Sequence, residues 1–225
     1  MEMTNRGLNG RKLQEENRKD LYLDLSVKTC EVNGTDKERI QLSALRAVAL
    51  AINGRDLYML GHSERVAQYC ERVASSMQLS DDQRYFLGLS AWLHDAGNLS
   101  TPGYILRKPS ALFEEEMEEV MVHPVKGAEI FAKEPGLAEV ARSIRHHHER
   151  FDGTGYPDHL AGEAIPLFSR IILVADAYEA MTHDRAYRPA VPHNEAVERI
   201  RQGATTQFDP EVVESFIAVM GSSGR

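Results

Sequence analysis

Apolar positions recur every three or four residues along most of this chain, which is the spacing of one buried face of an α-helix. The first such run covers residues 40–52, and the turn dipeptide Asn53-Gly54 ends it. The next run opens at His62 and places Val66 and Val73 on one face. We therefore expect a helix before residue 53 and a second helix that begins at His62.

The middle of the chain repeats this pattern, with polar residues and prolines between the apolar runs. One run ends at Leu93, and Asp81 or Asp82 can cap its beginning. Gly97 ends that segment, and a loop with prolines follows over residues 102–109. Further helices are predicted at five places: residues 114–122, a helix with Pro124 in its first turn, and residues 137–148, 194–202 and 210–220.

Residues 171–177 form an almost wholly apolar run, Ile-Ile-Leu-Val-Ala-Asp-Ala. Such a run fits a buried strand as well as a buried helix, but Tyr178–Met181 extends it to helical length. Strand signals are scarce elsewhere in the chain. The pattern therefore predicts an all-α protein built as a bundle of helices.

At 225 residues, 42% of them hydrophobic, the chain can bury the core of a single domain. We expect a polar N-terminal extension over residues 1–38 and the domain over residues 39–225. The net charge of −8 argues against bulk binding to DNA or RNA, which needs an electropositive face. Cys30 and Cys70 make no disulfide framework, so a cytoplasmic location is expected. No run of about 20 apolar residues could span a membrane.

The densest chemistry lies in residues 145–157, Arg-His-His-His-Glu-Arg-Phe-Asp-Gly-Thr-Gly-Tyr-Pro. Three adjacent histidines add little stability by themselves, but neutral imidazole is the commonest metal ligand. The glycines and the proline cannot continue a helix, so we expect the histidines at the end of one. Read alone, the segment also fits a histidine-rich end of a surface helix.

Five other polar residues lie at expected helix ends or on an apolar helix. His94-Asp95 ends an apolar helix, where a capping histidine beside a surface aspartate is the commoner case. Asp176 follows five apolar residues, so we expect it to pair with an arginine or to hold a metal. His62 and His123, each taken alone, are more often capping or surface histidines.

Together these residues make a consistent set of metal ligands: His62, His94, Asp95, His123, His147, His148 and Asp176. A helical bundle can gather such positions around one centre. Five imidazoles and two carboxylates are too many for one tetrahedral zinc, and they suit two ions with a bridging carboxylate. Mixed imidazole and carboxylate donors favour iron, manganese, zinc or nickel over magnesium or calcium. Two ions close together are an arrangement that hydrolyses phosphate esters.

The pair His94-Asp95, with His62 upstream and Asp176 downstream, resembles the HD phosphohydrolase superfamily. The segment from His147 to Pro157 is similar to the HD-GYP subfamily, the bacterial cyclic di-GMP phosphodiesterases. Further motifs that match are His123-Pro124-Val125-Lys126-Gly127, Val174-Ala175-Asp176-Ala177-Tyr178, Asp184-Arg185-Ala186-Tyr187-Arg188 and Phe208-Asp209-Pro210. The resemblance covers about residues 40–220 and implies an HD-type helical bundle with a metal centre at its core.

The resemblance implies a role for each residue that matches. Implied metal ligands are His62, His94, Asp95, His123, His147, His148 and Asp176, with Asp95 bridging two divalent ions, iron or manganese ahead of zinc or nickel. Implied catalytic residues are His94, Asp95 and Asp176. Implied substrate-binding residues are Asn98, Tyr156, Arg185 and Arg188, since planar arginine forks suit phosphate and guanine. The Gly155-Tyr156-Pro157 loop is also implied as a contact for a diguanylate cyclase, a GGDEF protein.

The chain departs from the family pattern in the loop Thr101-Pro102-Gly103-Tyr104 and at two single positions. Asn98 stands where the family has a lysine that is thought to contact phosphate, so slower turnover or weaker binding is expected. Members with three ions carry an acid four residues before the first histidine, and Tyr58 stands there. We therefore predict two ions.

The expected function is metal-dependent hydrolysis of cyclic di-GMP to linear pGpG or to GMP. Asn98 leaves open a weak or inactive module that binds cyclic di-GMP or a diguanylate cyclase. A hydrolase for another cyclic dinucleotide, or for a nucleotide monophosphate, is a third interpretation. Neither a nucleic acid nor a membrane is expected as a partner.

Overall fold

The computed structural model describes residues 61–108, 110–184 and 189–221. Helices dominate these residues, which contain no β-strand and only an isolated bridge between Ala204 and Phe208. The prediction of an all-α fold is therefore confirmed. The helix expected before residue 53 and the domain boundary at residue 38 lie outside the described residues and stay predictions.

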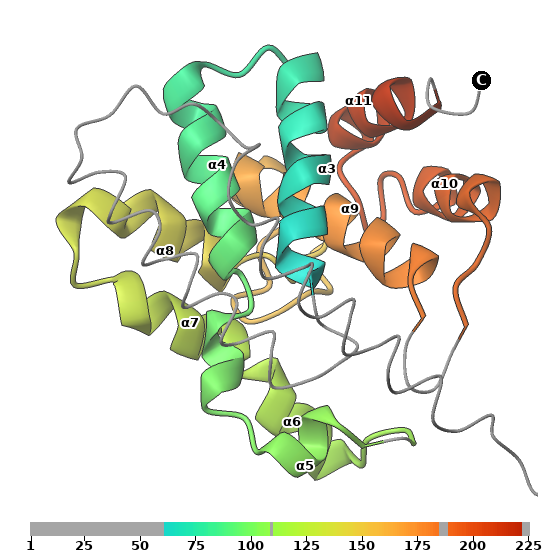
Figure 1. Ribbon diagram of the computed structural model, residues 1–225. Coiled ribbons are helices and arrows are strands. Elements are labelled where there is room, and N and C mark those ends of the chain that lie inside the picture. Colours follow the sequence, from blue (N-terminus) through green and yellow to red (C-terminus); the bar gives the residue numbers. More distant parts are fainter. Residues whose placement is uncertain (1–60, 109, 185–188, 222–225) are drawn as a thin grey trace, which may run out of the picture. The chain divides into compact units, whose positions relative to one another are not determined.

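Figure 1 shows the helices in the colours of the sequence. The α-helices are α3 (His62–Ser76), α4 (Asp81–Leu93), α5 (Gly103–Leu106), α6 (Glu114–Met121), α7 (His123–Phe131), α8 (Ala138–Arg145), α9 (Leu167–Thr182), α10 (His193–Gln202) and α11 (Pro210–Gly221). Short 3₁₀ helices lie between them: η2 (Ala96–Leu99), η3 (Pro135–Leu137) and η4 (Gly162–Ala164). Helix α5 falls inside the segment that the sequence predicts as a loop; the other helices predicted within the described residues are observed with shifts of their ends.

Helix α4 begins differently from the prediction that Asp81 or Asp82 caps it. The cap is Ser80, whose hydroxyl accepts a hydrogen bond from the amide of Gln83 at 3.3 Å. The Gln83 side chain in turn accepts from the amide of Ser80 at 2.9 Å, which completes a capping box. The two aspartates lie in the first turn instead, where the helix dipole favours carboxylates.

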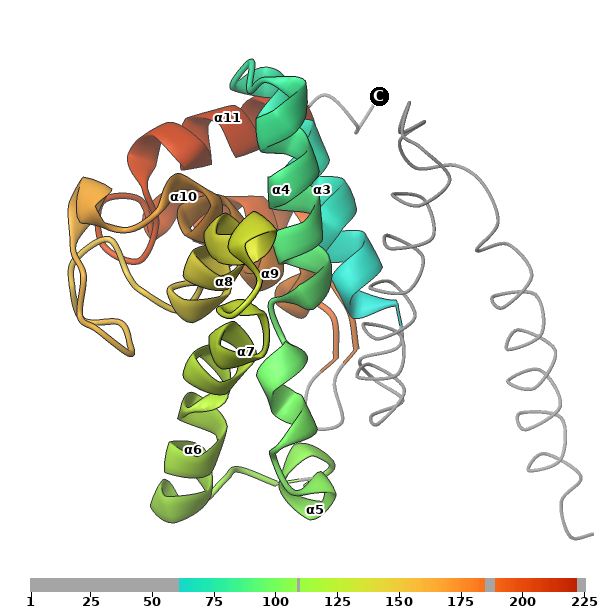
Figure 2. The ribbon, with the colours of Figure 1, turned by 90° about the vertical axis from the view of Figure 1, so that its left-hand side faces the viewer.

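Helix α9 is the central element of the described helices and packs against α3, α4, α8, α10 and α11 (Figures 1 and 2). Its residues Ile171, Ile172, Val174 and Ala175 are fully buried. Because helices cover α9 on several sides, it is apolar all round instead of along one face. This explains why residues 171–177 show no helical periodicity, and the alternative of a buried strand is wrong.

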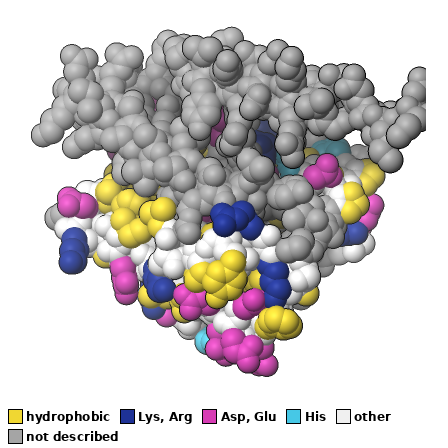
Figure 3. Space-filling view, turned by 60° about the horizontal axis from the view of Figure 1, so that its bottom comes forward, with side chains coloured by type: hydrophobic (Ala, Val, Ile, Leu, Met, Phe, Trp, Pro, Cys, Tyr) yellow, Lys and Arg dark blue, Asp and Glu magenta, His cyan; other side chains and the backbone are white. Residues whose placement is uncertain are grey.

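The remaining helices pack around this core or lie beyond it. Helices α3 and α4 lie side by side, and α7 packs against both α8 and η2 (Figure 2). Helices α5 and α6 lie beyond α7, where Tyr104 and Phe113 are 69% and 68% exposed. On the face turned forward in Figure 3, hydrophobic side chains lie among charged ones. None of the described helices is both long and apolar enough to span a membrane.

Candidate metal centre

Helices α3 and α4 each place a predicted ligand at one end. His62 is the first residue of α3 and follows Gly61, whose φ of 75° lies in the left-handed region. His94 is the C-cap of α4, and Asp95 follows it at the start of η2. All three side chains are buried. The negative end of the α4 dipole favours a cation beside His94 and Asp95.

The backbone of Gly97 brings Asp95 against helix α7. A Cβ atom on Gly97 would lie 1.9 Å from the carbonyl oxygen of His123 and 2.7 Å from the amide nitrogen of Gly127. A residue with a side chain therefore cannot make this approach. The close contact leaves His123 Nε2 3.4 Å from Asp95 Oδ1.

The sequence predicts a helix through His148, but α8 ends at Arg145, so His147 and His148 follow the helix. Asp176 comes from the central helix α9. His146, the first of the three adjacent histidines, is directed elsewhere. Its Nδ1 lies 2.9 Å from a backbone carbonyl oxygen and its Nε2 lies 2.9 Å from Asp158 Oδ2. Both of its ring nitrogens are thus occupied, and it takes no part in the centre.

Backbone carbonyls orient three of the central histidines. The Nδ1 atoms of His94, His123 and His147 lie 2.8, 2.7 and 2.6 Å from the carbonyl oxygen three residues earlier. A carbonyl oxygen can only accept a hydrogen bond, so each Nδ1 carries the ring proton. Each Nε2 is left with a lone pair, which is the form of histidine that binds a metal.

These ring nitrogens face one another in two places. His123 Nε2 lies 3.2 Å from His147 Nε2, and His62 Nε2 lies 3.2 Å from His94 Nε2. The first pair has no proton to place between its two nitrogens, and a cation would satisfy both lone pairs. Carboxylates surround the second pair, with Asp176 Oδ1 3.4 Å from His62 Nε2, so this pair also attracts positive charge. The donor set therefore fits divalent metal ions.

The donor atoms form three overlapping groups, and within each group they lie within 4.8 Å of one another. One of them, His94, Asp95 and His147, shares a member with each of the other two. We name these other two the His62 group (His62, His94, Asp176) and the His123 group (His123, His147, His148). Asp95 lies between the groups, because its Oδ1 faces His123 while its Oδ2 lies 3.5 Å from His94 Nε2. One carboxylate thus offers an oxygen to each group. Ligation by these seven residues, and their catalytic roles, stay predictions.

The environment adjusts the protonation of the central side chains. Burial lowers the pKa of His123 and His147, and it lowers the pKa of His148 to about 4. Burial opposes ionisation of Asp95 too, but the neighbouring histidines, His94 first, hold its pKa well below the usual range. Burial also acts against a charged His62, yet its hydrogen bond to Glu179 and the nearby carboxylates raise its pKa. Neutral imidazoles and an ionised carboxylate are the forms that bind metals.

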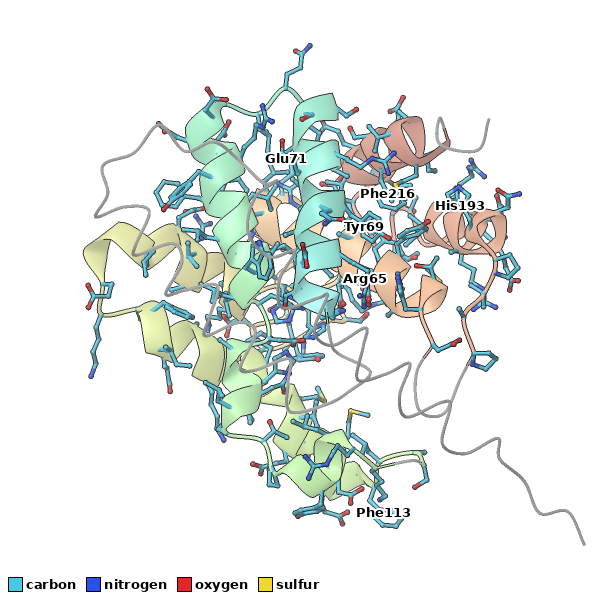
Figure 4. All side chains as sticks on the ribbon, viewed as in Figure 1. Arg65, Tyr69, Glu71, Phe113, His193 and Phe216 are labelled. Atoms are coloured by element: carbon cyan, nitrogen blue, oxygen red, sulfur yellow. The ribbon has the colours of Figure 1, made fainter. Side chains whose placement is uncertain are left out.

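Sequence reasoning missed two residues that support the centre. Glu179 is buried on α9, and its Oε2 accepts a hydrogen bond from His62 Nδ1 at 2.7 Å. Its Oε1 accepts from Arg65 Nε at 2.9 Å. Arg65, on α3, is labelled in Figure 4. A signal was present, because Glu179 follows Asp176 by three residues and Arg65 follows His62 by three. Residues at this spacing share a helix face.

Asn98 and Tyr156, which the sequence assigns to substrate binding, both contact predicted ligands. The side-chain amide of Asn98 donates to Asp95 Oδ1 at 3.0 Å. The ring of Tyr156 stacks on His148 with 5.0 Å between centroids, next to the cis bond to Pro157. Substrate binding by either residue stays a prediction. Arg185 and Arg188 lie outside the described residues.

The family model described as HD domain matches residues 46–212 of this chain. The match spans the described helices from α3 to α10 and all seven residues of the two groups and Asp95. The resemblance to the HD superfamily that the motifs indicate is therefore confirmed.

Two characterised relatives show the kind of protein to which the chain is similar. The 3'3'-cGAMP-specific phosphodiesterase 3 of Vibrio cholerae is 38% identical over 160 residues, which are 71% of this chain and 35% of that relative. The cyclic di-GMP phosphodiesterase response regulator RpfG of Xanthomonas campestris is 36% identical over 81% of this chain and 48% of its own length. The chain thus spans less than half the length of these relatives.

A solved structure supports the fold. The crystal structure of the cyclic GMP-AMP-specific phosphodiesterase V-cGAP3 of V. cholerae has a TM-score of 0.62 at 20% sequence identity. The similarity covers 80% of this chain and 48% of that one. The predicted arrangement as an HD-type helical bundle is confirmed.

Proposed function

This chain belongs to the HD domain family, and on that premise we propose that it is a metal-dependent phosphodiesterase that hydrolyses cyclic di-GMP. The observation that carries the proposal is the position of Asp95 between two groups of metal donors, each of which holds two histidines or more. The names of the relatives agree, since they are phosphodiesterases of cyclic dinucleotides. The products would be linear pGpG or GMP.

The two groups would each hold one divalent ion. His62, His94 and Asp176 would bind the first, His123, His147 and His148 would bind the second, and Asp95 would bridge them. When bound, two such ions neutralise negative charge that develops on a phosphate and make water a better nucleophile. Imidazole-rich donors together with carboxylates favour iron or manganese, ahead of zinc or nickel.

The chain's own residues hold this centre rigid. Backbone carbonyls fix three imidazoles, Asn98 fixes one oxygen of Asp95, and the Tyr156 ring covers one side of His148. Burial raises the pKa of the Tyr156 hydroxyl, and Asp95 and Asp176 raise it further, so this hydroxyl stays protonated next to the carboxylates. It is therefore able to donate a hydrogen bond to an anionic phosphate. Arg185 and Arg188 would supply further donors from the segment after α9.

The Gly155-Tyr156-Pro157 loop is also our candidate contact for a diguanylate cyclase. The loop connects back to His148 through the amide of Tyr156, which donates to the His148 carbonyl oxygen at 3.3 Å. A partner bound there would lie beside the His123 group. Such a partner would make the cyclic dinucleotide that the centre consumes.

Turnover by the purified chain tests the proposal. The metal-free protein is loaded with iron or manganese without oxygen and is supplied separately with cyclic di-GMP, 3'3'-cGAMP and cyclic di-AMP. We expect hydrolysis of cyclic di-GMP, and a decrease of about 100-fold or more for Asp95→Asn, because both ions lose a shared ligand.

The substrate panel separates the alternatives. Faster hydrolysis of 3'3'-cGAMP than of cyclic di-GMP would mean that the substrate is the one named for the V. cholerae relative. Tight binding of cyclic di-GMP without turnover, with every metal tried, would favour a binding module. No binding and no turnover with any of the dinucleotides would overturn the proposed function.

A further inference from the structure

His62 is held differently from the other central histidines. The rings of His94, His123 and His147 donate through Nδ1 to a neutral backbone carbonyl on their own segment. His62 donates through Nδ1 to a carboxylate oxygen of Glu179, 117 residues away on α9, at 2.7 Å. The two groups of donors are therefore unequal, because an ionised acceptor makes the imidazole a stronger donor to a metal.

The second oxygen of Glu179 has its own partner. Oε1 accepts from both Nε and Nη2 of Arg65, at 2.9 and 2.5 Å, and lies 3.5 Å from His183 Nδ1, while Oε2 is the oxygen that accepts from His62. Glu179 is 1% exposed, and the arginine supplies the charge that a buried carboxylate needs. Figure 4 shows Arg65 on α3, at the helix end next to α9. The ion pair between Arg65 and Glu179 therefore fixes which carboxylate oxygen of Glu179 is turned toward His62.

We infer that Glu179 is a positioning residue, which holds His62 in the tautomer that can bind a metal and so sets the metal affinity of the His62 group. The inference rests on the proposed function only for the presence of two ions. With Nδ1–H held by Glu179, the lone pair of His62 lies on Nε2, 3.2 Å from His94 Nε2. A ring with its proton on Nε2 would block that position.

Replacing Glu179 by glutamine changes this tautomer with little change in shape. The amide has one oxygen and one NH₂ group, and Arg65 can only donate hydrogen bonds. The amide oxygen of Glu179→Gln therefore stays with Arg65, and the NH₂ group turns toward His62. His62 Nδ1 must then accept, so its proton moves to Nε2, in the place of the metal.

Metal titration tests the inference without any substrate. The metal-free wild type and Glu179→Gln are titrated with manganese by calorimetry, and bound metal is counted by elemental analysis. We expect two ions per chain for the wild type. For Glu179→Gln we expect one ion with unchanged affinity and a second bound 10- to 100-fold more weakly.

Two control variants remove carboxylate–arginine pairs that contact no central histidine. Glu71→Gln on α3 removes the pair with Arg84, and Asp209→Asn removes the buried pair with Arg170. Both variants are expected to bind two ions with wild-type affinity. Equal loss of one ion in Asp209→Asn and in Glu179→Gln would mean that general loosening, and not the tautomer, is responsible.

A second measurement needs no variant and guards against a Glu179→Gln protein that does not fold. In the metal-free wild type, labelled with ¹⁵N at histidine, the ring nitrogen shifts of His62 report which atom of the neutral ring carries the proton. We expect the proton on Nδ1. A proton on Nε2 would overturn the inference at once.

The inference and the proposed function fail separately. A wild type that binds two ions but hydrolyses no cyclic dinucleotide would overturn the function and leave the role of Glu179 intact. A Glu179→Gln protein that binds both ions as the wild type does would overturn the inference, whatever the turnover. A wild type that binds no metal would overturn both.

Discussion

Asn98 donates its side-chain amide to Asp95 Oδ1, the oxygen that also faces His123. This contact places Asn98 beside the carboxylate of Asp95, where it limits the rotation of that group. A lysine at this position would bring a positive charge toward the same oxygen and would compete with a metal for it. The hydrogen bond gives a physical reason for an asparagine here that the sequence pattern did not contain.

Removal of this hydrogen bond should lower activity without unfolding the protein. We expect Asn98→Leu, which keeps the size of the side chain, to lower kcat for the cyclic dinucleotide by about 10- to 100-fold, as a hydrogen bond to a charged group is worth about 1.5–3 kcal/mol. Steady-state kinetics and a thermal melt check this. A gain of activity in Asn98→Lys would show instead that the missing lysine limits the wild type.

Single residues at the centre could be predicted from the sequence because their chemistry is unusual for their position. A carboxylate such as Asp176 inside an apolar run, and adjacent histidines before a glycine-rich turn, both stand out. Glu179 and Arg65 did not stand out, because a charged residue near a helix end is ordinary. Their role depends on which helix lies opposite, and this is a property of the tertiary structure.

At the scale of helices, the contact between η2 and α7 depends on two glycines. The Cβ position of Gly97 coincides with the backbone of α7, and that of Gly127 lies 3.0 Å from the amide nitrogen of Gly97. The sequence predicts Gly97 only as a helix stop. Its larger role, which is to let two backbones touch between Asp95 and His123, follows from packing.

Alanine at this contact should separate the two groups of donors. We expect Gly97→Ala to lower the free energy of unfolding by about 1–3 kcal/mol or more and to weaken metal binding. The reason is that the added methyl group meets backbone atoms, which cannot rotate away as a side chain can. Urea denaturation and metal titration measure both effects.

Helix α4 offers a matched control for that substitution. The Cβ position of Gly88 has no atom within 4 Å, so Gly88→Ala should be neutral or stabilising, by up to about 1 kcal/mol. If the two variants behaved alike, the proposed contact between η2 and α7 would be refuted.

Helix positions could be predicted wherever one face of the helix is exposed, and prediction was hardest at α9. A helix covered on several sides carries no periodic pattern, so its length alone argued against a strand. The observed cap of α4, Ser80, lies one or two residues before the predicted ones, Asp81 and Asp82, for a related reason. Serine and aspartate both cap helices, and only the reciprocal contact with Gln83 decides between them.

For the molecule as a whole, folding buries several histidines where the helices meet, and this burial opposes their protonation. Without metal, burial keeps His123, His147 and His148 neutral in the folded state, although an exposed histidine has a pKa near 6.5. The unfolded chain therefore binds more protons below about pH 6.5. His62 acts with the opposite sign, because its pKa is raised in the folded state.

Acid should consequently destabilise the metal-free protein. Three lowered pKa values against one raised value leave a net uptake of protons on unfolding, so stability falls as the pH drops from about 6.5 toward about 4. The slope is about 1.4 kcal/mol per pH unit for each net proton. Urea denaturation of the chelator-treated protein between about pH 7 and pH 5 measures it, and His148→Gln should reduce the slope. A free energy of unfolding that stays constant over this range would contradict the prediction.

The order in which the donors occur along the chain has a consequence for how the centre is filled. Asp95 and all three members of the His123 group have been synthesised once residue 148 is made, whereas the His62 group waits for Asp176 on the central helix. The ligands proposed for one ion are therefore synthesised well before those proposed for the other. Metal uptake by the His62 group would then report that the polypeptide has closed on itself.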